Sequence, residues 1–388
     1  MRVALVTENF LPKLDGVTRT LAMLLEHLQR HGHKAIVLGP EGALRAYAGA
    51  RIFGAPGFPI PFYPELRVLF PAPRLERRLA RFRPDIVHVV DPMLLGAAGI
   101  AWGRQLGAPV LSTYHTNLAE YCTYFHLSAL VAPMWSYRRF LHNQCALTLC
   151  PSPSTSTQLL KHGFSRVGVW ARGVDGESFR PERRSQAWRK RITHDPTIPI
   201  ILYVGRLSYE KNLDDLVKAF RMLDDCSAHL VLVGDGPARA DIKRALQGRR
   251  VTFTGYLKGE ALTEAYASAD MFAFPSVTET FGQVVMEAMA SGLPVVAYDA
   301  EGVRDSVRHG ETGLLTPARD SLALAEGLRT LLAEPERRRM MGAAAHAYAS
   351  QRNWSDMLDQ LLATYQRVIA RQKDDTQADA IPDAEGAA

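Results

Sequence analysis

The 388-residue sequence predicts an α/β protein with two doubly wound domains, each built around a parallel sheet. First, short apolar runs rich in β-branched residues recur between amphipathic helical stretches in both halves of the chain. Second, several of these runs are apolar throughout, which is typical of parallel strands buried on both faces by crossover helices. We expect the domains to face each other across a cleft at the carboxyl ends of their strands, where ligands of such sheets bind.

Ten strands are expected, five in each half of the chain. Those of the first half are Val3–Thr7, Ala35–Leu38, Ile86–Val90, Val110–Tyr114 and Leu147–Cys150. Those of the second half are Ile200–Val204, His229–Val233, Thr252–Thr254, Met271–Phe274 and Val295–Ala297. A helix over Val17–Gly32 is expected between the first two strands.

Changes in composition predict the domain boundaries. The first domain is expected over residues 1–172 and the second over residues 197–353, with a polar, weakly periodic linker over residues 173–196. A long helix over residues 354–370 follows and is expected to pack back on the first domain. Residues 371–388 are polar and rich in alanine, so disorder is predicted for them.

Composition excludes several classes of protein. Apolar residues make up 47% and charged residues 22%, the balance of an ordinary globular protein. No apolar stretch approaches the ~18 residues of a membrane span, and the N-terminus lacks the features of a signal peptide. Four cysteines are too few and too irregularly spaced for a disulfide framework or a zinc site. We therefore expect a soluble, cytoplasmic protein.

The net charge of +6 hides an asymmetry between the two halves. Residues 1–195 contain 25 lysines and arginines against 13 acidic residues, a net charge of +12, whereas the remainder carries −6. A basic half suggests an anionic partner, either nucleic acid or an anionic membrane surface. A solvated basic surface without a partner is the alternative.

The loop after the first strand, Glu8–Gly16, is not a Gly-x-Gly-x-x-Gly dinucleotide loop, which disfavours a dehydrogenase. Gly16 stands at a helix N-terminus, where unpaired backbone N–H groups favour an anion. A simple turn glycine is an equally good explanation. In the second domain, Arg206 and Lys211 leave a buried strand on the cleft side and could converge on one dianionic group. Two surface residues at a strand end are the alternative.

The most informative stretch runs from Glu279 to Glu287. Glu279 follows a buried strand, Phe281 and Gly282 begin the next helix, and Glu287 lies on that helix. A carboxylate at a helix mouth accepts hydrogen bonds from sugar hydroxyls, while helix N–H groups donate to phosphate oxygens. A second carboxylate further along can take a ribose diol. Two solvated helix carboxylates are the alternative, but the flanking Phe-Gly and Gly292-Leu-Pro make the pattern specific.

These residues resemble the retaining GT-B glycosyltransferases, the large family that holds sucrose synthase and the phosphatidylinositol mannosyltransferases. The resemblance extends to about residue 370 and rests on Gly205-Arg206 to Asn212, Gly234-Asp-Gly-Pro, Phe253-Thr-Gly255-Tyr256, and Glu279 to Glu287. His115 in Ser-Thr-Tyr-His-Thr, Pro133-Met-Trp and Gly173-Val-Asp175 resemble the sulfoquinovosyl-diacylglycerol synthases, and the GDP-mannose-dependent lipid mannosyltransferases are similar too.

The resemblance implies that Gly16, Arg206 and Lys211 bind the donor pyrophosphate. It further implies that residues 255–257, Gly255 and Tyr256 among them, offer backbone groups to the base.

The resemblance also assigns the sugar end of the donor. Glu279 would hold the sugar hydroxyls, Glu287 the nucleotide ribose, and His115 the sugar from the opposite domain. The chain departs from the family pattern at one place. Many relatives have Gly-Gly before an acidic residue, whereas this chain reads Glu301-Gly302-Val-Arg-Asp305. The local backbone shape is therefore in question there.

No Asp-x-Asp motif occurs in the sequence, so the usual metal clamp on a nucleotide diphosphate is missing. Arg206, Lys211 and helix-terminal N–H groups would neutralise the leaving group instead, and we predict a reaction without metal or other cofactor. No residue is recognisable as a covalent nucleophile. The family resemblance implies front-face attack, in which the acceptor hydroxyl enters beside the leaving phosphate and the phosphate takes its proton.

Two segments of the first domain suggest an acceptor at a membrane. Arg74–Arg83 contains five arginines around three apolar residues, and residues 114–140 are rich in aromatic residues, with Arg138 and Arg139 beside them. Ordinary core packing with a solvated basic face is the alternative. Together they predict docking on anionic lipid at the inner face of the membrane, without crossing it.

The sequence thus predicts a retaining glycosyltransferase that moves a hexose from GDP-mannose or a UDP-sugar to a lipid or glycolipid acceptor. A nucleotide-sugar epimerase or hydrolase on the same fold is the second hypothesis, and donor consumption without acceptor would favour it. A nucleic-acid-binding protein is the third, and a salt-sensitive RNA shift would be its test. It leaves Glu279 and Glu287 unexplained, so nucleic acid is not expected as a partner.

Overall fold

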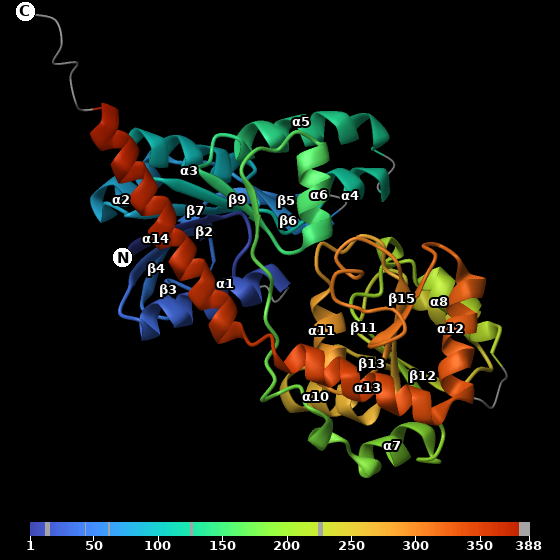
Figure 1. Cartoon of the computed structure of the whole chain (residues 1–388). Helices are drawn as coiled ribbons and strands as arrows, with labels where there is room; N and C mark the ends of the chain where they lie inside the picture. Colours follow the sequence, from blue (N-terminus) through green and yellow to red (C-terminus); the bar gives the residue numbers. More distant parts are fainter. Residues whose placement is uncertain (12–15, 43, 61–62, 125–126, 224–227, 380–388) are drawn as a thin grey trace, which may run out of the picture. The chain divides into compact units, whose positions relative to one another are not determined.

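The computed structural model describes the chain except for residues 12–15, 43, 61–62, 125–126, 224–227 and 380–388 (Figure 1). The chain folds into two compact units. Unit 1 consists of Met1–Pro151, Ser156–Ala171 and Ser355–Ala388, and unit 2 of Ser152–Thr155 and Arg172–Trp354. Each unit is built on a largely parallel sheet with helices, which confirms the predicted α/β class.

Unit 1 contains an eight-stranded sheet with the order β10-β9-β8-β7-β1-β2-β4-β3. Its strands are β1 (Arg2–Thr7), β2 (Lys34–Pro40), β3 (Ala46–Tyr47), β4 (Ala50–Ala55), β7 (Ile86–Val90), β8 (Val110–Thr113), β9 (Leu147–Cys150) and β10 (Val167–Val169). All neighbours pair in parallel apart from β3 and β4. Strands β5 (Gly57–Ile60) and β6 (Tyr63–Leu69) form a separate antiparallel pair. The strand order reverses between β1 and β7, so residues that follow these two strands lie at the usual ligand edge of the sheet.

The helices of unit 1 are α1 (Gly16–Arg30), α2 (Pro73–Phe82), α3 (Leu94–Gln105), α4 (Leu118–Tyr124), α5 (Val131–His142), α6 (Pro153–Lys161), which begins in unit 2, and α14 (Trp354–Asp379). The C-terminal helix α14 is tied to the sheet through the buried His88 of β7, whose Nδ1 lies 2.6 Å from the Tyr365 hydroxyl. Burial lowers the pKa of His88 to about 3, so its imidazole is neutral and hydrogen-bonded instead of charged.

Unit 2 contains a six-stranded, entirely parallel sheet with the order β13-β12-β11-β14-β15-β16. Its strands are β11 (Ile200–Val204), β12 (His229–Val233), β13 (Val251–Gly255), β14 (Met271–Phe274), β15 (Val295–Tyr298) and β16 (Gly313–Thr316). Strands β11, β12, β14 and β15 are buried over their whole length, as their continuous apolar sequences predict. This is the doubly wound order in which ligands bind beside the first and fourth strands, here β11 and β14.

The helices of unit 2 are α7 (Gln186–Thr193), α8 (Leu213–Arg221), α9 (Arg239–Ala245), α10 (Gly259–Ser268), α11 (Gln283–Ala290), α12 (Ser321–Ala333) and α13 (Pro335–Ser350). Short 3₁₀ turns occur at Ser128–Leu130 in unit 1 and at Pro181–Arg183 and Tyr209–Lys211 in unit 2. None of the helices in the described part of the chain is both long and apolar enough to cross a membrane.

Two boundaries expected from the sequence are wrong. The segment 173–196 is an integral part of unit 2, because α7 buries Trp188 and because the Arg189 guanidinium is buried and donates to Asp270 Oδ2 at 2.8 Å. The C-terminal helix runs to Asp379, nine residues past its expected end, because residues 371–379 contain neither glycine nor proline. The remainder of the predicted disordered tail, residues 380–388, lies outside the described residues.

Candidate active site

The strand-end loops of unit 2 bring together two residues that the sequence separates widely. Lys211 ends the turn that follows β11, and Glu279 lies on the loop after β14. The Lys211 Nζ atom lies 2.5 Å from Glu279 Oε1, and the two side chains are only 16% and 21% exposed. A charge-assisted contact of this length, shielded from water, is stronger than a surface ion pair. The two predicted residues therefore form one charged centre beside β11 and β14.

Hydroxyl groups hold the loop of Glu279 against the loop that follows β11. Ser276 Oγ donates to Glu279 Oε1 at 3.3 Å, and Thr278 Oγ1 donates to the carbonyl oxygen of Glu210 at 3.3 Å. Glu210 itself accepts from Ser208 Oγ at 2.5 Å. The Thr278 hydrogen bond thus joins the two loops, while the other two bonds fix the carboxylates of Glu279 and Glu210 within their own loops.

Arg206 leaves the same strand end and is half-buried. Its carbonyl oxygen accepts from the hydroxyl of Tyr203 at 3.1 Å. Burial raises the pKa of Tyr203, so that hydroxyl keeps its proton and donates. The backbone of Arg206 is thus anchored to the core at the end of β11, where the sequence predicts a residue that binds pyrophosphate.

Glycines cover the ends of the three neighbouring strands β11, β12 and β13. Gly234 N donates to the carbonyl of Gly255 at 2.8 Å, and a Cβ atom on Gly234 would lie 1.9 Å from the carbonyl oxygen of Gly205. The backbones of Gly205 and Gly234 therefore pack directly on one another, and a side chain on Gly234 is excluded. Tyr256 beside them is 63% exposed and donates its hydroxyl to the carbonyl of Asp235 at 2.9 Å.

Helix α11 carries the second predicted carboxylate. Gly282 precedes the helix with φ 78°, and Glu287 is buried on it, accepting from the Tyr266 hydroxyl at 3.1 Å. One carboxylate oxygen of Glu287 is therefore engaged by the protein. The side chain of Phe281 is also buried and packs in the core of unit 2. Only the backbone of Phe281 is thus available to a ligand.

Gly302 supports the Glu279 loop from behind. Its φ is +74°, and a Cβ atom there would lie 2.5 Å from the carbonyl carbon of Thr280 and 2.7 Å from the carbonyl oxygen of Glu279. The loop backbone that the sequence leaves in question at Glu301–Asp305 therefore packs directly against the Glu279 loop. Gly302 corresponds to the second glycine of the family's Gly-Gly pattern, and a glycine is required there because any side chain would collide with the backbone of the Glu279 loop.

We expect Gly302→Ala to lower kcat at least tenfold, because the added methyl group pushes the Glu279 loop away from Lys211. Gly310→Ala is the matched control, since Gly310 also has a positive φ of +80° but no atom within 4 Å of its Cβ position. Transfer kinetics and thermal melts of both variants separate displacement of the loop from backbone strain. Equal kcat values for the two variants would contradict the role given to Gly302.

In unit 1, His115 follows β8 and is held by a residue that the sequence analysis did not single out. The backbone N–H of His115 donates to Asp91 Oδ1 at 2.9 Å, and Arg138 pairs with the same oxygen at 2.8 Å. Burial alone would raise the pKa of Asp91, but the Arg138 charge and the hydrogen bonds bring it below its ordinary value. The His115 turn is therefore built on an ionised, partly buried carboxylate.

Arg138 was expected on a membrane-docking face together with Arg139, and for Arg138 this is wrong. The side chain is 2% exposed, and its guanidinium lies 4.6 Å from the centre of the Tyr114 ring. A buried arginine that pairs with a carboxylate and stacks on an aromatic ring is a structural element. The sequence signal for this burial is Asp91, an acidic residue directly after the apolar strand β7 that can neutralise a buried arginine.

Glu8 is a second such residue, which the sequence indicates only as the start of a loop. It follows β1, is buried, and its Oε1 accepts from Gly96 N at 2.9 Å and from Met93 N at 3.2 Å, at the start of α3. Burial raises the pKa of Glu8 to about 7, although these N–H groups lower it. Gly16 is the first residue of α1, and residues 12–15 before it lie outside the described residues.

Each unit thus places charged groups at the reversal of its strand order. In unit 2, cations, glycine-lined backbone and a carboxylate lie at one edge of the sheet. That set suits a ligand with phosphate groups at one end and hydroxyl groups at the other, as a sugar attached to a diphosphate has.

Comparisons with known proteins agree with this chemistry. A family described as "Glycosyltransferase Family 4" matches residues 14–178, and one described as "Glycosyl transferases group 1" matches residues 184–348. The chain is 38% identical over 378 residues to a GDP-mannose-dependent alpha-mannosyltransferase of Mycobacterium tuberculosis, covering 96% of this chain and 98% of that protein. It is 37% identical over 363 residues to a sulfoquinovosyl transferase of Arabidopsis thaliana, covering 91% and 71%. The solved sucrose-phosphate synthase from Thermosynechococcus elongatus shares the fold, with a TM-score of 0.75 at 22% identity over 95% of this chain and 99% of that one.

The fold and the site therefore define an enzyme that transfers sugars on two Rossmann-like units. The chain belongs to the GT-B glycosyltransferases, with a Family 4 domain followed by a group 1 domain. This confirms the family predicted from the motifs around Arg206 and Glu279.

Proposed function

We propose that the enzyme moves a hexose, with retention of anomeric configuration, from a nucleoside-diphosphate sugar to a lipid or glycolipid acceptor. The observation that carries the proposal is the Lys211–Glu279 centre beside β11 and β14. GDP-mannose is the donor to test first, since the mycobacterial relative is named for it, and a UDP-hexose is the alternative.

Each end of the donor has residues to receive it in this proposal. Arg206 and Lys211 neutralise the pyrophosphate, with Gly16 on the side of unit 1, and backbone groups of residues 255–257 bind the base. When the donor enters, the Lys211 ammonium exchanges Glu279 for phosphate oxygens, which leaves the carboxylate to accept hydrogen bonds from sugar hydroxyls. Charge that develops on the leaving diphosphate then meets cations that are already in position.

The remaining contacts concern the ribose and the sugar face. Glu287 accepts hydrogen bonds from the ribose diol in this proposal, and His115 of unit 1 is the residue that we expect to contact the sugar. The acceptor hydroxyl attacks the anomeric carbon on the side of the leaving phosphate. The bond to the phosphate oxygen breaks, the bond to the acceptor oxygen forms, and the leaving phosphate takes the acceptor's proton.

The test is incubation of the protein with GDP-mannose, UDP-glucose and other nucleotide sugars, with and without a membrane-lipid extract, in excess EDTA. We expect nucleotide release that depends on lipid, a new lipid heavier by one hexose, and retention of the anomeric configuration by NMR. Nucleotide release without acceptor would indicate a hydrolase, and conversion of the donor sugar an epimerase. A strict requirement for added magnesium or manganese would contradict the metal-free mechanism.

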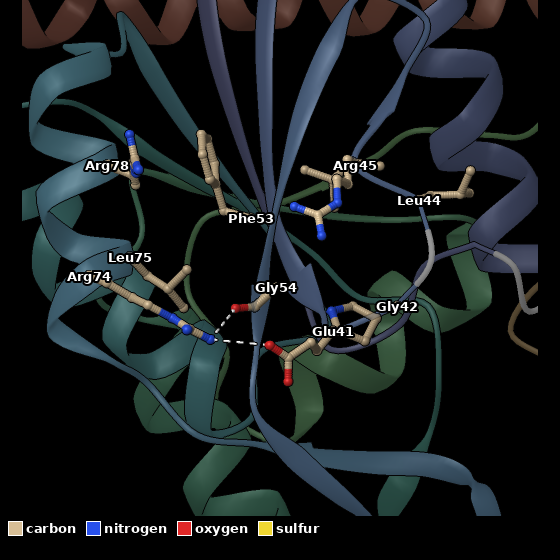
Figure 2. Close-up of a pocket in the computed structure, with 11 residues that line it drawn as sticks. Glu41, Gly42, Leu44, Arg45, Phe53, Gly54, Arg74, Leu75 and Arg78 are labelled. Atoms are coloured by element: carbon tan, nitrogen blue, oxygen red, sulfur yellow. Dashed lines mark hydrogen bonds and ion pairs between the residues drawn. The ribbon is translucent and has the colours of Figure 1, made fainter.

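A basic surface on unit 1 supports an acceptor in a membrane. Helix α2 buries Leu75 and Leu79, and its arginines lie on the exposed face. A hollow of about 300 Å³ beside the helix is lined by Arg45, Arg74 and Arg78, with the carboxylate of Glu41 among them (Figure 2). Arginines around a hollow suit the phosphate of a lipid headgroup, and we propose that this face docks on anionic lipid from the cytoplasmic side.

Replacing Arg77, Arg78 and Arg81 together by glutamine is expected to weaken binding to vesicles with anionic lipid about 10- to 100-fold, because each basic residue near such a surface contributes about 1 kcal/mol. Vesicle co-sedimentation at rising salt measures this effect, since screening weakens the attraction. Transfer to a lipid-embedded acceptor should fall, while transfer to a short soluble acceptor should stay.

The matched control replaces Arg244, Arg337 and Arg339 of unit 2, three exposed arginines in helical ion pairs, by glutamine. It changes the net charge equally. Equal loss of vesicle binding in the two triple variants would show that total charge, and not the α2 face, drives binding. Unchanged binding in the α2 variant would remove this face from the proposal.

A further inference from the structure

Three potential metal ligands meet in unit 1 where the C-terminal helix α14 contacts α1. His27 and His31 lie one helical turn apart on α1, and Asp359 lies near the start of α14. One ligand atom from each residue lies within 4.8 Å of the other two. Within the described part of the chain, this is the one group of three histidine, cysteine or carboxylate side chains that close together.

The distances in this group suit a small metal ion. His27 Nε2 lies 2.9 Å and His31 Nε2 lies 3.8 Å from Asp359 Oδ1. Ligand atoms on a tetrahedral zinc ion, with bonds of about 2.0–2.1 Å, are roughly 3.3 Å apart. The two observed distances lie on either side of that value, so small side-chain rotations bring all three atoms to one ion.

The spacing of the two histidines follows helix geometry. Residues four apart on a helix share one face, and two histidines at that spacing are a recurrent pair of zinc ligands. Here the ring centres are 4.2 Å apart, which shows that both imidazoles already lie side by side. The carboxylate comes from a helix 332 positions away in the sequence, so only the folded unit completes the set.

The other ring nitrogens agree with this role. His31 Nδ1 lies 2.9 Å from the carbonyl oxygen of His27, so it carries the proton and directs Nε2 outward as an acceptor. His27 Nδ1 accepts from the Arg30 guanidinium at 3.5 Å, a long and weak hydrogen bond that is lost when the ring proton moves to Nδ1 and Nε2 binds the metal.

We propose that His27, His31 and Asp359 bind a divalent transition metal ion, zinc among those that two imidazoles and one carboxylate suit. The buried His27 forms the floor of the site, while His31 and Asp359 are about half exposed and leave a fourth position to water. Because the ion links α14 to α1, it stabilises unit 1. The site is separate from the residues proposed for sugar transfer.

The experiment uses the untagged, full-length protein freed of metal with a chelator. Calorimetric titration with Zn²⁺ is expected to show one ion per chain, and saturating zinc to raise the melting temperature by several degrees, because the ion binds only the folded unit. Co²⁺ in place of zinc is expected to give the visible absorption of a tetrahedral site. Absence of zinc binding at micromolar concentration would overturn the proposal.

His31→Gln and Asp359→Asn test the ligands, and both residues are exposed enough for the variants to fold. Each is expected to weaken zinc binding at least about tenfold, the least that loss of a supporting group costs such sites, and to abolish the zinc-dependent rise in melting temperature. His33→Gln is the control, since His33 is two residues further on but lies outside the group. Wild-type affinity in either ligand variant, or equal weakening in the control, would contradict the proposed ligands.

Discussion

Replacing Glu279 by glutamine is expected to reduce kcat for sugar transfer about 10²–10³-fold, while the affinity for the nucleotide changes little. The carboxylate touches the sugar hydroxyls in the proposed complex, so its loss affects the reactive pose more than the binding of base and phosphates. Glutamine keeps the shape and one oxygen for Ser276, but it removes the charge that positions Lys211 at 2.5 Å. Alanine, which removes both oxygens, should nearly abolish transfer.

Single-turnover kinetics and titration with the nucleotide separate these two effects. The control is Glu334→Gln, because Glu334 is an exposed carboxylate in unit 2 that pairs with Arg337 at 3.3 Å. It should behave as wild type in both measurements. A Glu279→Gln enzyme with wild-type kcat would show that this carboxylate does not contact the reacting sugar.

Lys211→Met is expected to lower kcat/KM by a comparable factor, about 3–4 kcal/mol of transition-state stabilisation, because the leaving diphosphate loses a cation in a partly shielded site. Arg206→Ala should have a similar effect. Steady-state kinetics measure the loss of kcat/KM, with the nucleotide sugar that the enzyme is found to use as donor. Lys218→Met is the control, since the exposed Lys218 pairs with Asp215 on helix α8 and lies outside the proposed site.

The double variant Lys211→Met/Glu279→Gln distinguishes a catalytic centre from a purely structural ion pair. If the pair only stabilised the fold, the double variant would recover the stability that each single change loses, and activity with it. We expect recovery of stability at most, with kcat as low as in the worse single variant. Recovered activity would contradict the assignment of both residues to the reaction.

Much of the architecture was predictable from local patterns. All ten expected strands are present, because continuous apolar, β-branched runs between amphipathic helices can hardly form anything except buried parallel strands. Strands β3, β4, β5, β6, β10 and β16 were not predicted. Strands β3 and β10 are short, and β3, β4 and β10 are partly exposed. They therefore lack the continuous apolar run by which buried strands are recognised in a sequence. Helix α7 was missed because its polar sequence hides the burial of Arg189, which depends on Asp270, 81 positions away.

By itself, the sequence determined the α/β class, the family motifs and the strand ends on which Arg206, Lys211, Glu279 and His115 lie. Only the tertiary structure decided which of these residues meet. The contact between Lys211 and Glu279 depends on β11 and β14 being neighbours, and that order follows from how the helices pack on the sheet. The same holds for Asp91 with Arg138, whose pairing offsets the cost of burying two charges. Periodicity records which side of an element is buried, but it carries no information on the distant partner, because contacts between elements are set by packing in three dimensions.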